Sequence, residues 1–211
     1  MKYLKTNKPP TKRTSDILRD IAQETGTGEI TVGDFVAMLK DRSFALAILI
    51  FSLPNSLPIP GIPGFSTITG LPILFIALQI LWGCKAIWLP RKIAGKRFQQ
   101  QFLTKAIHKA LPVVEWLEKF LHPRLIIICE SIGERFIGFL IAVMAFILAL
   151  PIVGANFLPG LSISLLALAL LENDGVFAAF SILFTLASLY FLYEVILLVV
   201  SGAAHWVSGL V

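Results

Sequence analysis

The sequence predicts an all-α integral membrane protein made of two related halves with Pro/Gly-broken or re-entrant helices, together with amphipathic cytoplasmic helices. Two observations indicate this class. Of the 211 residues, 56% are hydrophobic and 15% are charged, whereas a soluble domain carries about 25% charged residues. All 18 lysines and arginines precede Phe136. This asymmetry is typical of a membrane protein whose basic segments face the cytoplasm.

Residues 1–42 are predicted to form a cytoplasmic leader followed by two short amphipathic helices. The first 13 residues are rich in Lys and Pro, and no apolar stretch of a cleavable signal peptide follows them. TSDILRDIAQET and TVGDFVAMLKDR then place apolar residues at helical spacing. Thr14 or Ser15 is the candidate N-cap of the first helix, and Thr31 that of the second.

Residues 43–90 are predicted to form the first membrane repeat. An apolar run at 44–53 is followed by LPNSLPIPGIPGFSTITGLP at 53–72, which holds five of the 12 prolines, and then by a second apolar run at 73–82. Proline removes a backbone donor and clashes with the preceding turn, so we expect the helix to break here. The repeat is therefore either a hairpin of two short tilted helices or a re-entrant loop.

Residues 91–123 are predicted to form a basic, amphipathic linker on the cytoplasmic face. Between Lys85 and Arg124 there are nine basic residues but only two acidic ones, Glu115 and Glu118. We expect one or two helices, broken near Pro112. Because this segment adjoins apolar spans, membrane lipids with anionic headgroups are the expected partner. No nucleic-acid-binding motif is present, so nucleic acid is not an expected partner.

Residues 124–211 are predicted to contain the second membrane repeat and a C-terminal transmembrane helix. An apolar stretch at 125–150 precedes the break PIVGANFLPG, the short apolar run LSISLLALALL and the turn ENDG. The stretch at 176–200 is long enough to cross a bilayer. Glu172 and Asp174 are interpreted as turn residues.

The two breaks contain the same features in the same order, which predicts an internal repeat. The matched pairs are Leu53–Pro54 with Leu150–Pro151, PGFS at 63–66 with PGLS at 159–162, and Gly83 with Gly175. Interrupted segments at corresponding positions of two halves indicate a transporter's binding site. Alternatively, Pro and Gly only allow helices to kink and pack closely. The candidate substrate-binding residues are Asn55, Ser66, Thr67, Glu130, Glu134, Asn156, Ser162 and Glu194.

The acidic candidates have two interpretations. Glu130 and Glu134 lie one helical turn apart, and either line a cation path or lie at the cytoplasmic interface, where Arg135 would neutralise one of them. Glu194 lies inside the last span, where an ionisable residue usually faces a cavity or a partner. Alternatively, a hydrogen bond with Tyr190 or Ser201 satisfies it. The sequence contains no catalytic or metal-binding motif. We therefore expect no enzyme activity and no cofactor.

Several motifs resemble those of a known family. TVGDFVAMLKDRSFALAILIFSLPNSLPIPGIPGFSTITGLPILFIALQILWG, WLPRKIAGKRF and RFIGFLIAVMAFILALPIVGANFLPGLSISLLALALLENDG resemble the ExoD family of bacterial membrane proteins, named for exopolysaccharide synthesis. The resemblance covers residues 30–174. It implies a link to exopolysaccharide production and supplies no catalytic residues.

The leading hypothesis is a multi-pass transporter in the bacterial inner membrane. A small cationic solute, such as a basic amino acid, with or without protons, is expected to bind at the paired breaks, and a homodimer is expected. The alternative is a non-transporting accessory protein for exopolysaccharide synthesis or export, with the basic region at 85–124 as its docking surface. A lipid-handling protein is a third possibility.

Overall fold

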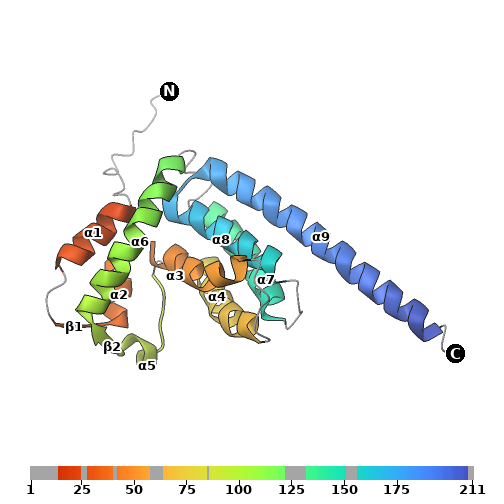
Figure 1. Ribbon diagram of the computed structural model, residues 1–211, viewed down its shortest axis with the longest axis horizontal. Helices are drawn as coiled ribbons and strands as arrows, with labels where there is room; N and C mark the ends of the chain where they lie inside the picture. Colours follow the sequence, from red (N-terminus) through yellow and green to blue (C-terminus); the bar gives the residue numbers. More distant parts are fainter. Residues whose placement is uncertain are drawn as a thin grey trace. The chain divides into compact units, whose positions relative to one another are not determined.

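The computed structural model describes residues 14–24, 28–39, 42–57, 64–84, 86–121, 132–150 and 156–208. The described residues are mostly helical (Figure 1). Contacts between Cα atoms divide the chain into two compact units. Unit 1 consists of Met1–Lys40 and Leu89–His122, and unit 2 consists of Asp41–Trp88 and Pro123–Val211.

Unit 1 is a pair of helices with a small sheet. Its elements are α1 (Thr14–Glu24), β1 (Glu29–Thr31), α2 (Val32–Leu39), α5 (Arg91–Ala94), β2 (Arg97–Gln99) and α6 (Gln100–Phe120). β1 and β2 pair antiparallel, with Ile30 opposite Phe98. The sequence did not predict these strands, because three residues are too few to show an alternating pattern.

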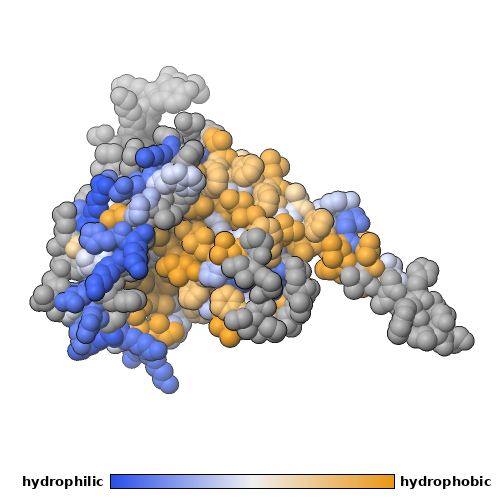
Figure 2. Space-filling model, viewed as in Figure 1, coloured by the Kyte–Doolittle hydropathy of each residue, from blue (hydrophilic) through white to orange (hydrophobic). Residues whose placement is uncertain are grey.

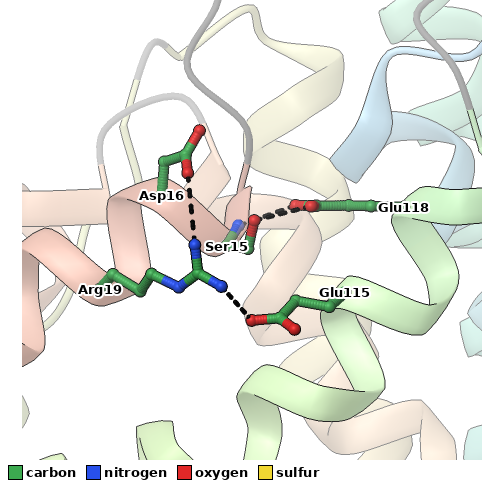
Figure 3. A network of polar contacts seen from close by, with 5 residues as sticks. All are labelled: Ser15, Asp16, Arg19, Glu115 and Glu118. Atoms are coloured by element: carbon green, nitrogen blue, oxygen red, sulfur yellow. Dashed lines mark hydrogen bonds and ion pairs between the residues drawn. The ribbon is translucent and has the colours of Figure 1, made fainter.

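The helices α1 and α6 are joined by apolar contacts and by a polar network. Their buried apolar residues are Leu18, Ile21, Leu103, Ile107, Leu111 and Val114. The Ser15 hydroxyl donates to Glu118 Oε2 at 2.6 Å, and the Ser15 N–H donates to Glu118 Oε1 at 2.7 Å. Arg19 Nη2 lies 2.6 Å from Glu115 Oε1, at the more exposed side of the same network (Figure 3).

Two expectations about unit 1 have different outcomes. Thr31 caps α2 as predicted, because its Oγ1 accepts from the Asp34 N–H at 3.1 Å and donates to Asp34 Oδ2 at 2.6 Å. The expected break near Pro112 is wrong, since α6 continues through this residue. Docking of the apolar face of α6 on α1 outweighs the loss of one backbone hydrogen bond.

Unit 2 contains the apolar helices. They are α3 (Ser43–Ser52), the 3₁₀ turn η2 (Leu53–Ser56), α4 (Phe65–Leu81), α7 (Ile132–Ala149), α8 (Phe157–Glu172) and α9 (Gly175–Ser208). The extensive contacts are those of α4 with α7, α3 with α8, and α8 with α9. Figure 2 shows apolar surface over these helices and polar surface over the elements of unit 1.

The first predicted break is shorter than expected. α3 ends at Ser52, η2 follows with Pro54 inside it, and α4 begins after Gly64, whose φ of 85° suits glycine. However, α4 runs through Pro72, which the sequence placed inside the break. One missing hydrogen bond is tolerated here because α4 is packed along its length against α7.

Glycines allow α4 and α7 to approach closely. A Cβ atom added to Gly70 would lie 2.9 Å from the backbone nitrogen of Ala149, and one added to Gly138 would lie 2.8 Å from Ile80 Cγ2. Small residues serve this purpose where apolar helices pack without a hydrophobic driving force between them.

Two described helices are long and apolar enough to cross a membrane, by length and composition. They are Ile132–Ala149, with 18 residues, and Gly175–Leu198, with 24 residues, each with a mean hydropathy of 2.0. Three shorter apolar helices accompany them at Ser43–Ser56, Phe65–Leu81 and Phe157–Glu172.

Candidate functional site

The end of α3 and the turn η2 lie against the first half of α8. Ser164 Oγ lies 2.7 Å from Ser52 Oγ and 2.6 Å from Ser56 Oγ. A Cβ atom added to Gly160 would lie 2.7 Å from the backbone of Asn55. The first Pro/Gly break therefore packs against the segment that begins with the second PG pair.

The end of α7 makes the corresponding contact with the start of α4. The Thr67 hydroxyl donates to the Ala149 carbonyl at 2.9 Å. Asn156 Nδ2, just before α8, donates to Ser66 Oγ at 3.1 Å. Each break thus contacts the beginning of the helix that follows the other break.

Asn55 connects the two sides of the first break. Its Nδ2 donates to Thr69 Oγ1 at 2.9 Å and to the Phe51 carbonyl at 3.2 Å. The Asn55 side chain is buried. Because the contact with Thr69 places the end of α3 beside the start of α4, the two helices form an antiparallel hairpin.

The helix α9 joins this region through small polar residues. The Ser162 hydroxyl donates to Ser188 Oγ at 3.2 Å, and both side chains are buried. Ser181, Thr185 and Ser188 donate to carbonyls four residues earlier in α9. Their hydroxyls are therefore satisfied inside an apolar setting, where an unpaired hydroxyl would be costly.

We call these side chains the turn cluster. Its members are Ser52, Asn55, Ser56, Ser66, Thr67, Thr69, Asn156, Ser162, Ser164 and Ser188. All are neutral hydroxyl or amide groups. Their oxygens can hydrogen-bond a polar solute or coordinate a hard cation. The cluster has no carboxylate, imidazole or thiol among its described members, and so no group suited to general acid–base chemistry.

The structure brings together five of the predicted site residues: Asn55, Ser66, Thr67, Asn156 and Ser162. The acidic candidates lie elsewhere. Glu134 is half-buried in the first turn of α7, at the end of that helix away from the cluster. Glu194 is exposed on α9, and Glu130 lies outside the described residues.

The sequence missed a buried ion pair at the other end of unit 2, because Glu172, interpreted there as a turn residue, is instead the buried last residue of α8. Arg42 Nη1 lies 3.7 Å from Glu172 Oε1, with the two side chains 11% and 7% exposed. The same nitrogen donates to the Leu171 carbonyl at the end of α8. Pairing Arg42 with a residue 130 positions away requires the tertiary contact of α3 with α8, which no local pattern predicts.

Two other charged residues, Asp174 and Arg135, lie at helix ends of unit 2. Asp174 Oδ1 accepts from the N–H groups of Val176 and Phe177 and so caps α9, in agreement with its interpretation as a turn residue. Gly83, just after α4, has φ of 74°, and a Cβ atom there would lie 2.6 Å from Arg135 Nη2. A cation at a helix C-terminus is favoured by the helix dipole.

The comparison with known families places this chain in one family. The family model described as "Exopolysaccharide synthesis, ExoD" matches residues 14–194. The chain belongs to the ExoD family. The resemblance seen in the sequence is thereby confirmed, and it extends through α9 as far as Glu194. The ExoD family is linked to exopolysaccharide synthesis.

Two curated relatives cover most of the chain. "Protein ExoD" of Rhizobium meliloti is 30% identical over 178 residues, which are 82% of this chain and 73% of that protein. An uncharacterized protein of Synechocystis sp. is 32% identical over 157 residues, which are 74% of each chain. No solved structure matches this ExoD-family chain.

Proposed function

We propose that this protein is a multi-pass membrane transporter of a small cation, acting in exopolysaccharide production. The observation that carries the proposal is the turn cluster, where both helix breaks meet and bury hydroxyl and amide groups. In a bilayer, irregular backbone is tolerated only where protein or a water-lined cavity satisfies it. Transporters place their sites at such paired breaks.

The contacts support two related halves, α3–α4 and α7–α8. α3 and α8 run antiparallel, because Arg42 meets Leu171 at one end and Asn55 meets Gly160 at the other. α4 and α7 also run antiparallel, because Gly83 meets Arg135 at one end. If α3 is matched with α7 and α4 with α8, the contact of α4 with α7 in one direction corresponds to the contact of α8 with α3 in the other. We infer a pseudo-two-fold axis along the helices, so that the halves are parallel rather than inverted repeats.

The distribution of charge favours a cation. In the described part of unit 2 the arginines are Arg42 and Arg135, and both lie at the end of the hairpins away from the turn cluster. The cluster therefore offers oxygens without a nearby positive charge. Its proposed mode of recognition is coordination by hydroxyl, amide and carbonyl oxygens, as hard cations prefer.

The proposed transport step is a separation of the two breaks. Ser52 and Ser56 would exchange their contacts with Ser164 for contacts with the solute. These hydrogen bonds are each worth about 0.5–1.5 kcal/mol net. A bound ion can therefore replace them without a large energetic barrier from the hydrogen bonds alone.

A flux assay on the purified protein in liposomes tests the proposal. The solutes are K⁺, Na⁺, lysine and arginine, with a neutral sugar as the control solute. We expect flux of at least one cation, reduced in Ser164→Ala and unchanged in Cys84→Ser, because Cys84 is exposed just after α4, at the end of that helix away from the turn cluster. Flux no higher than in empty liposomes for every cation would refute the transporter.

The accessory role remains the second candidate, supported by an exposed basic surface in unit 1. Arg91, Lys92, Lys96 and Arg97 are all exposed, and their charge suits an acidic partner. If this role is correct, charge reversal at Arg91 and Lys92 releases the protein from the synthesis machinery on co-purification and leaves cation flux absent in both forms.

A further inference from the structure

One face of the helix α9 packs on α8. This packing ends well before the C-terminal end of α9. The buried residues on this face recur every three or four positions: Ala178, Ser181, Thr185, Ser188 and Leu192. From Tyr193 to Ser201 every described side chain is exposed. α9 continues to Ser208 (Figure 1), so its second part extends beyond the cover that α8 provides.

Three polar residues in and just before this part of α9, Tyr190, Glu194 and Ser201, share one stripe with Leu197. Because an α-helix turns about 100° per residue, Tyr190, Glu194, Leu197 and Ser201 lie within about 60° of one another. The stripe is opposite the face formed by Thr185, Ser188 and Leu192. Tyr190 is 66% exposed and Leu197 45% exposed, and Glu194 is also exposed.

This arrangement is unfavourable for a face covered by lipid. An ionisable residue within a span normally faces protein or water, and hydroxyl groups in hydrocarbon require a hydrogen-bonding partner. Here the Glu194 carboxylate and the Tyr190 hydroxyl are gathered on the side turned away from α8, whereas the Ser201 hydroxyl already donates to the Leu198 carbonyl at 3.1 Å. No hydrogen bond or ion pair of Glu194 occurs among the described residues.

We propose that this stripe is the contact surface for a second copy of the same chain, with the two α9 helices side by side and parallel. Two copies inserted in one membrane with the same orientation present this stripe to each other at the same depth. The stripe is self-complementary, because the Tyr190 hydroxyl of each copy lies about one helical turn from the level of the second copy's Glu194 and can donate to that carboxylate. Homo-oligomers most often form such two-fold contacts.

The proposal depends on α9 crossing a membrane and is independent of transport. The two proposals can fail separately. The flux assay measures transport, and a cross-linking assay measures the pairing of two copies.

Cysteine cross-linking in native membranes tests the pairing. In a background with Cys84→Ser and Cys129→Ser, Leu197→Cys places a thiol on the stripe. Ile196→Cys is the matched control, since Ile196 is 51% exposed but lies about 130° around the helix from the middle of the stripe. Mild oxidation is expected to give a covalent dimer with Leu197→Cys and little with Ile196→Cys. Equal yields at both positions, no dimer, or a product with a different protein would overturn the proposal.

A second comparison tests the role of the carboxylate. In the Leu197→Cys background, Glu194→Leu is expected to lower the dimer yield several-fold, because a leucine accepts no hydrogen bond from the second copy. Glu194→Gln keeps an acceptor and is expected to retain the yield. If Glu194→Leu cross-links as efficiently as its parent, the carboxylate does not hold the two copies together and the proposed recognition through Glu194 is wrong.

Discussion

Glycine and serine residues control how closely the helices of unit 2 approach. Gly160 lies against the Asn55 backbone, and Gly70 lies against Ala149. Ser52 and Ser164 are buried and bonded to each other. Because side chains larger than these would separate the helices, the local geometry of the turn cluster depends on a few small residues.

Gly160→Ala is expected to destabilise the protein. The added methyl group would lie 2.7 Å from the Asn55 backbone, and overpacking of this kind costs about 1–3 kcal/mol. A lower melting temperature in detergent is the measurement. Gly28→Ala is the control, because its Cβ would lie at an ordinary 3.6 Å from Gln100 Oε1. Equal melting temperatures for the two variants would show that the close contact is absent.

Glu172→Gln is also expected to destabilise unit 2. It leaves the buried Arg42 guanidinium without its carboxylate, and breaking a buried ion pair costs about 3–5 kcal/mol. The comparison is Glu29→Gln, whose partner Arg97 lies 3.7 Å away in a pair 61–72% exposed, where about 0–1 kcal/mol is expected. Chemical unfolding measures both. A similar loss in the two variants would contradict the assigned role of Glu172.

At the scale of elements, the helices of unit 1 depend on side-chain partners from distant segments. The N–H of Ser15, in the first turn of α1, has no partner within the helix, and Glu118 of α6 accepts its hydrogen bond (Figure 3). The carboxylate also lies at the positive end of the α1 dipole. α1 is therefore held by α6 as well as by its own sequence.

Glu118→Gln should loosen α1 more than Glu115→Gln does. Glu118 is buried with both carboxylate oxygens bonded to Ser15, and hydrogen bonds to charged groups are worth about 1.5–3 kcal/mol. The Arg19–Glu115 pair is 51% and 40% exposed and is worth about 0–1 kcal/mol. Hydrogen exchange of the α1 amides is the readout. Faster exchange in Glu115→Gln than in Glu118→Gln would contradict this ranking.

At the scale of the whole molecule, the helices of unit 2 meet at their ends in two pairs. The start of α3 lies beside the end of α8, and the start of α7 lies beside the end of α4. Arg42 meets the end of α8, and Arg135 meets the residue after α4. The turn cluster lies at the opposite end of the same helices. Since all 18 basic residues precede Phe136, the proposed membrane topology has the arginine end on the cytoplasmic side.

Labelling with a membrane-impermeant maleimide tests this topology. Exposed Cys84, in a Cys129→Ser background, is expected to react from the cytoplasmic side. In a background without native cysteines, Val176→Cys is expected to react from that same side. Leu57→Cys, at the turn end and 54% exposed, should not. Labelling of Val176→Cys from the side opposite to Cys84 would indicate inverted halves.

The sequence by itself determined the helical class, the start of the first break, the cap at Thr31 and the family. These features depend on local backbone chemistry or on motifs within one segment. Proline and glycine act on their own backbone, and a capping hydroxyl reaches only three residues along the chain. Five polar site candidates could be selected for the same reason, because they flank the two breaks.

Only the tertiary structure decided which segments meet. It placed Asn55 against Gly160, joined Arg42 to Glu172, and separated Glu134 from the turn cluster. It also carried α4 through Pro72 and α6 through Pro112, since packing along a whole helix outweighs one missing hydrogen bond. Such contacts link residues about 50 to 130 positions apart, and they form only because apolar faces bury one another, which no single segment encodes.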